Sequence, residues 1–115
     1  MNEAIMRKHV EEAFEAARIV ADKEDAKLGD ERSRGLDCGF AWVICRPANS
    51  KLAKVLKLFG AYTDYAGGVC LWNPSGHHTQ SISPKEAGAR AFSEHLKNTL
   101  QGEGYSTLIV GSRYD

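Results

Sequence analysis

The sequence predicts a single α+β domain, residues 1–115, in which a long N-terminal helix precedes a ferredoxin-like antiparallel sheet. Two observations carry this prediction. Apolar side chains over residues 1–28 recur at three- and four-residue steps, the spacing of one helical face. Over residues 38–115, strand-like and helix-like segments follow the order β-α-β-β-α-β. Two strand-helix-strand halves joined by a hairpin can close through right-handed crossovers into a four-stranded antiparallel sheet with both helices on one face.

The N-terminal helix is expected over residues 2–28. Arg18 and Asp22 lie four residues apart and are predicted to pair on its solvent side. Gly29 is a natural end for the helix, and residues 30–38 have no periodicity, which indicates a connector. We expect this helix to cover the open face of the sheet or to pair with a second subunit there. Its inward stripe consists of Met6, Val10, Ala13, Phe14, Ala17, Val20 and Ala21.

The first strand is expected over residues 40–45, a six-residue apolar run of aromatic and branched side chains. Phe40, Trp42 and Ile44 point to one face and the residues between them to the other, and both sets are apolar. We therefore expect an interior strand with both faces covered.

A second helix is expected over residues 52–59, where apolar residues again follow the helical spacing. Asn49 or Ser50 can cap its start, and Gly60 can end it. Residues 61–68 are expected to form a loop.

Three further strands complete the predicted sheet. The first of them covers residues 69–73, and the turn residues Asn-Pro-Ser-Gly follow it at 73–76. Residues 79–82 are the predicted returning strand of this hairpin, although only one of them is apolar. The last strand is expected over residues 105–110, with a polar tail over 111–115.

The last helix has the clearest local signal in the chain. Ser83 and Pro84 begin a predicted capping box, with proline at the first helical position, and the helix should run to about residue 101. Gly88 costs about 1 kcal/mol against alanine in a helix interior, which predicts close contact with a neighbouring backbone. The residues expected to face inward are Ala89, Phe92, Leu96 and Leu100.

Composition limits the function classes. The chain has 15 Lys+Arg and 15 Asp+Glu and a formal net charge of zero, so a nucleic-acid partner is disfavoured unless a local basic patch exists. No run approaches the roughly 20 apolar residues of a membrane span. The N-terminal residues carry charges throughout, which predicts neither a signal peptide nor an anchor. Cys38, Cys45 and Cys70 have no CxxC spacing and indicate reduced thiols in an intracellular protein.

Hydrogen-bonding side chains gather in residues 72–83, the predicted hairpin. An indole there can stack on a planar ring, amide and hydroxyl groups can form hydrogen bonds, and guanidinium groups can meet an anion. We expect the hairpin to hold a small polar ligand such as a nucleotide, without catalysis, metal or cofactor. The predicted ligand-binding residues are Arg46, Trp72, Asn73, Ser75, His77, His78, Thr79, Gln80, Ser81 and Arg113.

Metal and enzyme sites fit the sequence less well. His77 and His78 would point to opposite faces of a strand, so they would rarely reach one zinc ion even with Cys70 or His95 recruited. Cys70 has no spacing that guarantees a base beside it for nucleophilic chemistry. There is also no glycine-rich phosphate loop. We therefore do not favour an enzyme.

Residues 38–43, CGFAWV, loosely match the aromatic strand of RNA-recognition motifs. Cys38 stands where that strand carries a basic residue, and the match falls on the first strand instead of the third. We expect core packing for Phe40 and Trp42, and a nucleic-acid-binding module ranks third among the functions. The second is a protein-protein interaction module.

Six segments resemble a family of small bacteriophage and prophage proteins. They are CGFAWV at 38–43, RPA at 46–48, WNP at 72–74, HTQS at 78–81, KEAGARAF at 85–92 and GSRYD at 111–115. The resemblance implies a phage accessory protein in the host bacterial cytoplasm, and it supplies no catalytic residues. The interaction module would then inhibit or adapt a host (defence) enzyme. We also expect a homodimer, because a sheet with two apolar faces must hide the second and two-fold pairing is the commonest solution.

Overall fold

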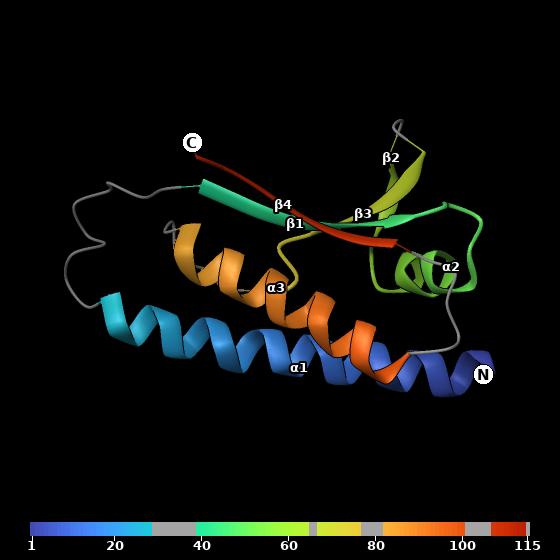
Figure 1. The fold of residues 1–115 in the computed structure, drawn as a ribbon, viewed down its shortest axis with the longest axis horizontal. Coiled ribbons are helices and arrows are strands. Elements are labelled where there is room, and N and C mark those ends of the chain that lie inside the picture. The colour runs from blue at the N-terminus through green and yellow to red at the C-terminus, as the bar shows by residue number, and fades with distance from the viewer. Residues whose placement is uncertain (29–38, 65–66, 77–81, 101–106, 115) are drawn as a thin grey trace.

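Seven helices and strands follow one another along the described chain. In this computed structural model the described residues are 1–28, 39–64, 67–76, 82–100 and 107–114. The domain mixes three helices with a four-stranded antiparallel sheet, as predicted at that level (Figure 1). The elements are α1 (Glu3–Leu28), β1 (Gly39–Arg46), α2 (Lys51–Leu58), β2 (Tyr62–Asp64), β3 (Gly68–Trp72), α3 (Ile82–Thr99) and β4 (Thr107–Tyr114).

The sheet has the strand order β2-β3-β1-β4, with every neighbouring pair antiparallel. β1 lies between β3 and β4, so its predicted interior position is confirmed, but the expectation that both of its faces are covered is wrong, because the helices lie on one side only. Trp42 of β1 lies opposite both Trp72 of β3 and Gly111 of β4. This register decides which side chains meet on each side of the sheet.

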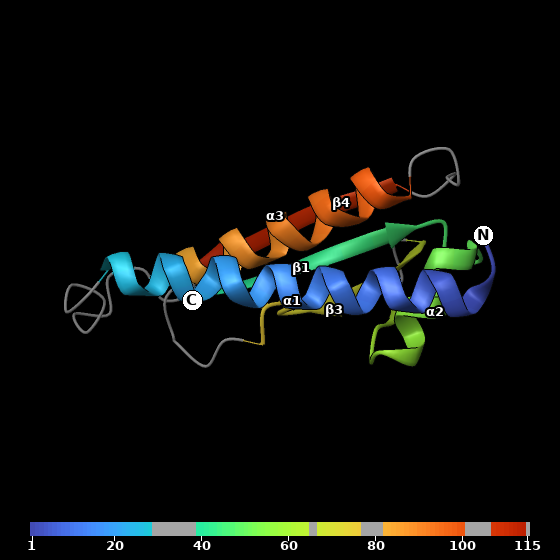
Figure 2. The same ribbon diagram turned by 90° about the horizontal axis from the view of Figure 1, so that it is seen from below.

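All three helices lie on one side of the sheet (Figures 1 and 2). α3 packs against β1 and β4, and α1 packs along α3. The expectation that the N-terminal helix covers the open face is therefore wrong. The buried stripe of α1 is rich in alanine, including Ala13, Ala17 and Ala21, and such small side chains let two helix backbones come close together. They would fill little space over large aromatic rings.

The two sides of the sheet differ because alternate strand residues point in opposite directions. Toward the helices, the covered face, β1 places Ala41, Val43 and Cys45, all fully buried. The other side, which we call the open face, carries a different set. It consists of Phe40, Trp42, Ile44 and Arg46 of β1, Tyr62 and Asp64 of β2, Gly68, Cys70 and Trp72 of β3, and Thr107, Ile109, Gly111 and Arg113 of β4.

The core lies between the covered face and the helices. Phe92 at its centre is fully buried and meets Phe14 of α1 edge to face, with ring centroids 4.9 Å apart. The inward residues predicted for the last helix, Ala89, Phe92, Leu96 and Leu100, are all buried. Within the predicted stripe of α1, Val20 is 36% exposed and lies at the margin of the packed surface.

Gly88 allows α3 to pack closely against its neighbours. A Cβ atom at this position would lie 2.5 Å from the Cβ of Ser75 and 3.1 Å from the carbonyl oxygen of Ala17. Ala17 belongs to α1, so the predicted close approach to a neighbouring backbone is confirmed. The contact also holds the turn after β3 against α3.

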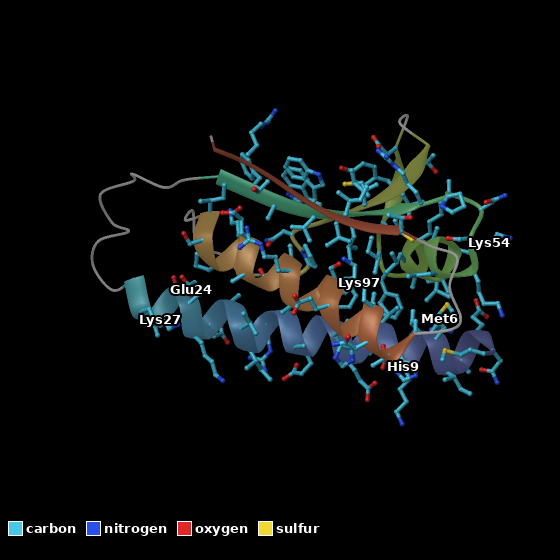
Figure 3. All side chains as sticks on the ribbon, in the orientation of Figure 1. Met6, His9, Glu24, Lys27, Lys54 and Lys97 are labelled. Carbon is cyan, nitrogen blue, oxygen red and sulfur yellow. The ribbon has the colours of Figure 1, made fainter. Side chains whose placement is uncertain are left out.

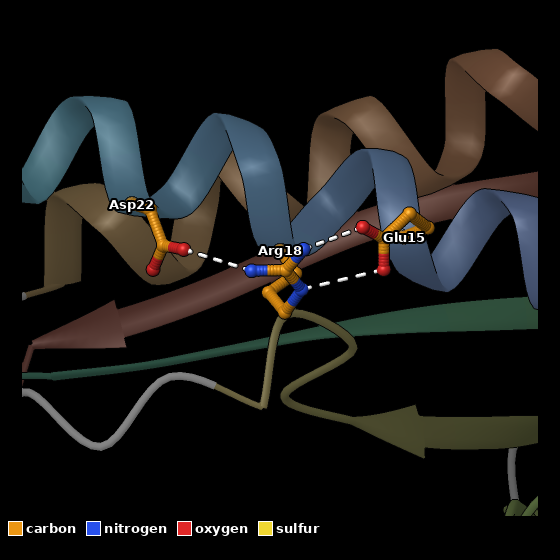
Figure 4. Close-up of polar contacts among 3 residues, drawn as sticks. All are labelled: Glu15, Arg18 and Asp22. Atoms are coloured by element: carbon orange, nitrogen blue, oxygen red, sulfur yellow. Dashed lines mark hydrogen bonds and ion pairs between the residues drawn. The ribbon is translucent and has the colours of Figure 1, made fainter.

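The outer side of α1 is charged, as the sequence predicts. Arg18 pairs with Asp22 at 3.2 Å and with Glu15 one turn earlier (Figure 4). The hydrogen bond from Arg18 lowers the pKa of Glu15 and raises that of Arg18 itself. All three side chains are more than half exposed, so these pairs contribute little to stability.

The helix ends partly follow the prediction. Ser50 caps α2 by accepting a hydrogen bond from the Ala53 amide at 3.2 Å, and Gly60 beyond its end has a φ of 102°. α3 begins at Ile82, so Ser83 lies inside its first turn and is not the cap that was predicted. Pro84 is tolerated there because amides of the first turn have no partner within the helix.

Two strand predictions are wrong. The hairpin joins β2 to β3, where residues 61–68 were expected to form a loop. Ile82 belongs to α3 and to no strand, while residues 79–81 lie outside the described part of the chain. β2 has only three residues, which is too short for an alternating pattern to appear in the sequence.

The C-terminal strand is longer than predicted. β4 continues to Tyr114 through the segment expected to be a polar tail, and it pairs with β1 along its whole length. Backbone hydrogen bonds form this ladder whatever the side chains are. Polar residues fit because Ser112 bonds Glu86 of α3 at 2.7 Å and Arg113 is exposed.

Candidate functional site

Three of the predicted ligand-binding residues share the open face. These are Arg46, Trp72 and Arg113, which come from three different strands. Two others, Asn73 and Ser75, lie in the turn after β3. The remaining five, His77, His78, Thr79, Gln80 and Ser81, fall outside the described residues.

Asn73 and Ser75 connect the end of β3 to the rest of the fold. The backbone amide of Asn73 donates to the Ala41 carbonyl at 2.9 Å. The Asn73 backbone has a φ of 45°, which asparagine tolerates better than most residues. The Ser75 hydroxyl donates to the Asn73 side-chain oxygen at 3.0 Å and is buried against Gly88. These polar groups hold the turn together.

Three aromatic rings form a cluster on the open face, which we call the ring cluster: Phe40, Trp42 and Trp72. The two indoles are stacked, with centroids 5.5 Å apart and planes 4° from parallel. Phe40 lies against Trp72 at 5.4 Å with a 37° tilt. Trp72 therefore contacts both other rings of the cluster, and it is still 46% exposed.

The register of the sheet fixes this cluster. Trp42 and Trp72 are directly opposite each other, the position at which cross-strand aromatic pairs interact most. On its other side Trp42 faces Gly111, where a Cβ atom would lie only 2.3 Å from the indole nitrogen. The Trp42 indole therefore lies over the glycine backbone, and any side chain at position 111 would displace it.

Positive groups lie at both ends of the open face. At one end Arg113 is paired with Phe40, and the Lys85 amine reaches from α3 to donate to the Gly39 carbonyl at 2.9 Å. The same amine lies 5.1 Å from the centre of the Phe40 ring, a cation-π distance. At the other end is Arg46, whose buried Nε has no hydrogen-bond partner within the described part of the chain.

Tyr62 of the edge strand β2 and Cys70 of the neighbouring strand β3 lie beside the ring cluster. They are directly paired between β2 and β3, and a hydrogen bond between their side chains raises the pKa of Tyr62. Cys70 is 6% exposed, whereas Tyr62 is 51% exposed. The buried thiol is thus directly paired with a half-exposed phenol.

The open face is suited to stacking and to attracting anions. Side chains project from the side of the sheet that faces away from α1 and α3 (Figure 3). The sequence predicted core packing for Phe40 and Trp42, and the structure places them with Trp72 at the surface instead. The available signal was the alternation of β1, in which every second residue is large and apolar while the intervening residues are mostly small.

Other site types lack support in the described residues. Residues 1–28, 39–64, 67–76, 82–100 and 107–114 contain no group of three His, Cys, Asp or Glu side chains that could hold a metal ion. Over the same ranges, no helix is long and apolar enough to cross a membrane.

Comparison of the chain with models of protein families, with curated proteins and with solved structures found no match.

Proposed function

We propose that this protein is a non-catalytic binding protein whose open face holds a planar, anionic ligand such as a nucleotide. One observation carries the proposal: Trp72 is 46% exposed at the centre of the ring cluster, with Arg113 at the end of the same face. The proposal keeps Arg46, Trp72 and Arg113 from the predicted site. The proposed ligand contacts lie on the open face of the sheet and not, as predicted, in the segment that follows β3.

Stacking and charge both favour such a ligand. Stacking of a base on an aromatic side chain contributes about 1–3 kcal/mol. A guanidinium group binds a phosphate through two parallel hydrogen bonds. The stacked Trp42 holds Trp72 in position before any ligand arrives, which reduces the ordering cost of binding.

A nucleotide panel tests this proposal. Titration of purified protein with mononucleotides should quench tryptophan fluorescence and raise the melting temperature. Trp72→Ala should abolish both responses, while Ile19→Ala, a substitution at a comparably exposed apolar residue on α1, should leave them unchanged. Native mass spectrometry of protein purified from cells should find a bound small molecule. Absence of any response across the panel would contradict a nucleotide-sized ligand.

Two finer assignments belong to the same proposal. The order β2-β3-β1-β4 supports a ferredoxin-like arrangement, because β3 lies between β1 and β2, and β1 lies between β3 and β4. The resemblance of segments such as CGFAWV at 38–43 and KEAGARAF at 85–92 to small bacteriophage and prophage proteins supports a phage accessory protein acting in the bacterial cytoplasm. Cross-strand amide contacts measured by nuclear magnetic resonance would test the first assignment, and expression from an infecting phage with localisation of the tagged chain would test the second.

A second candidate is a protein-protein interaction module, with a host enzyme or a second copy of this chain as partner. Exposed apolar side chains extend the open face beyond the ring cluster, with Ile109 at 40% and Tyr62 at 51% exposure. Patches of this kind mark protein interfaces. Light scattering at tens of micromolar tests the homodimer: twice the monomer mass for the wild type and the monomer mass for Trp72→Ala would favour it.

A further inference from the structure

Resting on the proposed function, we infer that the open face binds single-stranded nucleic acid along β1, and that a free nucleotide occupies only part of this site. The inference comes from where the positive groups lie. Arg113 is paired with Phe40 near the start of β1, whereas Arg46 is the last residue of β1 and is paired with Thr107. The ring cluster lies between Arg46 and Arg113.

The distance between these arginines exceeds the reach of one nucleotide. Phe40 and Arg46 are six residues apart on one strand, which at about 3.3 Å per residue corresponds to about 20 Å. A stacked strand places a phosphate about every 3.4 Å. A chain of several nucleotides can therefore contact both guanidinium groups while its bases meet the rings between them.

The local charge fits a polyanion although the chain is neutral. Among the described residues of the open face, the positively charged side chains are Arg46 and Arg113, and the one carboxylate is Asp64. Lys85 adds a positive charge beside Phe40. The net charge of zero disfavoured a nucleic-acid partner unless positive charge gathers locally, and near this face Arg46, Lys85 and Arg113 outnumber the one described carboxylate.

The shape of the face favours single strands over duplexes. Sequence and stacking contacts with a duplex need an element that enters a groove, whereas unpaired bases can lie flat against aromatic rings on a sheet. The rings of Trp42 and Trp72 belong to two adjacent central strands. Bases of a chain that runs along β1 can therefore meet rings from both of these strands.

Fluorescence anisotropy with labelled dT12 and rU12 tests the inference. The 12-mers should bind at least 10-fold tighter than dTMP or UMP, and the two sequences distinguish DNA from RNA. Trp72→Ala should weaken 12-mer binding at least 10-fold. Arg46→Gln combined with Arg113→Gln should reduce the slope of log affinity against log salt by about 1.4, since each phosphate contact on a single strand contributes about 0.7. Ile19→Ala and Arg18→Gln, on α1, serve as matched controls that should change neither quantity.

The outcomes separate this inference from the proposed function. If dTMP or UMP binds as tightly as the 12-mers and Trp72→Ala removes that binding, the inference is overturned and the proposed function stands. If neither mononucleotides nor 12-mers bind, both fail. If a dimer forms, dissociates on Trp72→Ala and excludes the 12-mers, a second copy occupies the face and the inference is overturned. Circular dichroism of each variant confirms that a loss of binding is not a loss of folding.

Discussion

The two faces of the sheet differ in the size and burial of the side chains that β1 contributes to each. On β1 the covered face carries Ala41, Val43 and Cys45, which are fully buried beneath the helices. The open face carries Phe40 and Trp42, which alternate with these residues along β1, and Trp72 lies opposite Trp42; these larger rings remain partly in water. Burial of apolar area stabilises a fold by about 25 cal/mol per Å². The chain thus leaves its largest apolar side chains where this stabilisation is incomplete.

This difference indicates that packing determines the residues of the covered face, and we propose that binding determines those of the open face. Small side chains on the covered face let α3 approach the sheet, so their size is set by packing. Nothing in the described fold covers the open face, where large rings contribute less to stability than they would in a core. Exposed aromatic groups of this kind are typical of a binding surface.

The largest expected effect is on the covered side. Phe92→Ala should lower the free energy of unfolding by about 3–5 kcal/mol, because it leaves a cavity among Phe14 and the strands. Urea unfolding measures this loss. Equal destabilisation by Phe92→Ala and by Trp72→Ala would contradict the difference between the covered face and the open face, because both faces would then contribute to packing alone.

A second change tests the closeness of the helix layer. Gly88→Ala should destabilise the protein by about 1–3 kcal/mol, because the new methyl group meets Ser75 and the Ala17 carbonyl. Alanine in an exposed helix would instead stabilise by about 1 kcal/mol. Arg90→Ala on the exposed side of α3 is the matched control. A rise in melting temperature for Gly88→Ala would show that α1 and α3 can separate without cost.

On the open face, Trp72→Ala should cost only about 1 kcal/mol. It removes cross-strand contacts with Phe40 and Trp42, and such pairs contribute about 0.2–1 kcal/mol each. Thermal unfolding should therefore show a small loss, while near-ultraviolet circular dichroism should lose the signal of the stacked indoles. A loss above about 3 kcal/mol would place Trp72 in the core.

The smallest effect concerns pH. The hydrogen bond with Cys70 raises the pKa of Tyr62, so the folded state binds that proton more tightly than the unfolded state does. The resulting stability is present below the ordinary tyrosine pKa of about 10 and is lost as pH rises through the raised value. Wild type should lose melting temperature slightly more steeply above pH 10 than Tyr62→Phe does. Cys70→Ala should return the pKa of Tyr62 toward its ordinary range in a spectrophotometric titration, and an unchanged titration would contradict the assigned cause.

Local signals predicted much of the fold. The long N-terminal helix, the interior β1, the Ser50 cap and the close contact at Gly88 all follow from spacing or propensity, and the structure confirms each. β2 was missed because three residues carry no period. The position of α1 was predicted wrongly because an apolar stripe indicates only that a helix packs against something. Which element it packs against depends on contacts between residues far apart in the sequence.

The candidate site was also predicted only in part from the sequence. Residue type alone singled out Trp72, Arg46 and Arg113 as able to stack or to bind an anion. Their shared face depends on the register that pairs Trp42 with Trp72, which no single segment specifies. Phe40 and Trp42 were assigned to the core for the same reason, since an apolar strand does not reveal which face the helices cover.

The contact between Gly88 and the Ala17 carbonyl has a consequence for biosynthesis. The two residues are about 70 positions apart, and a ribosome adds about 5–20 residues per second, so Ala17 waits about 4–14 s for its partner to be made. Throughout that interval α3, the helix against which the alanine stripe of α1 packs, is incomplete, and the stripe remains open to chaperones or to a neighbouring nascent chain. Slower translation of the segment before α3 lengthens this interval, so the yield of folded protein should depend on codon choice there.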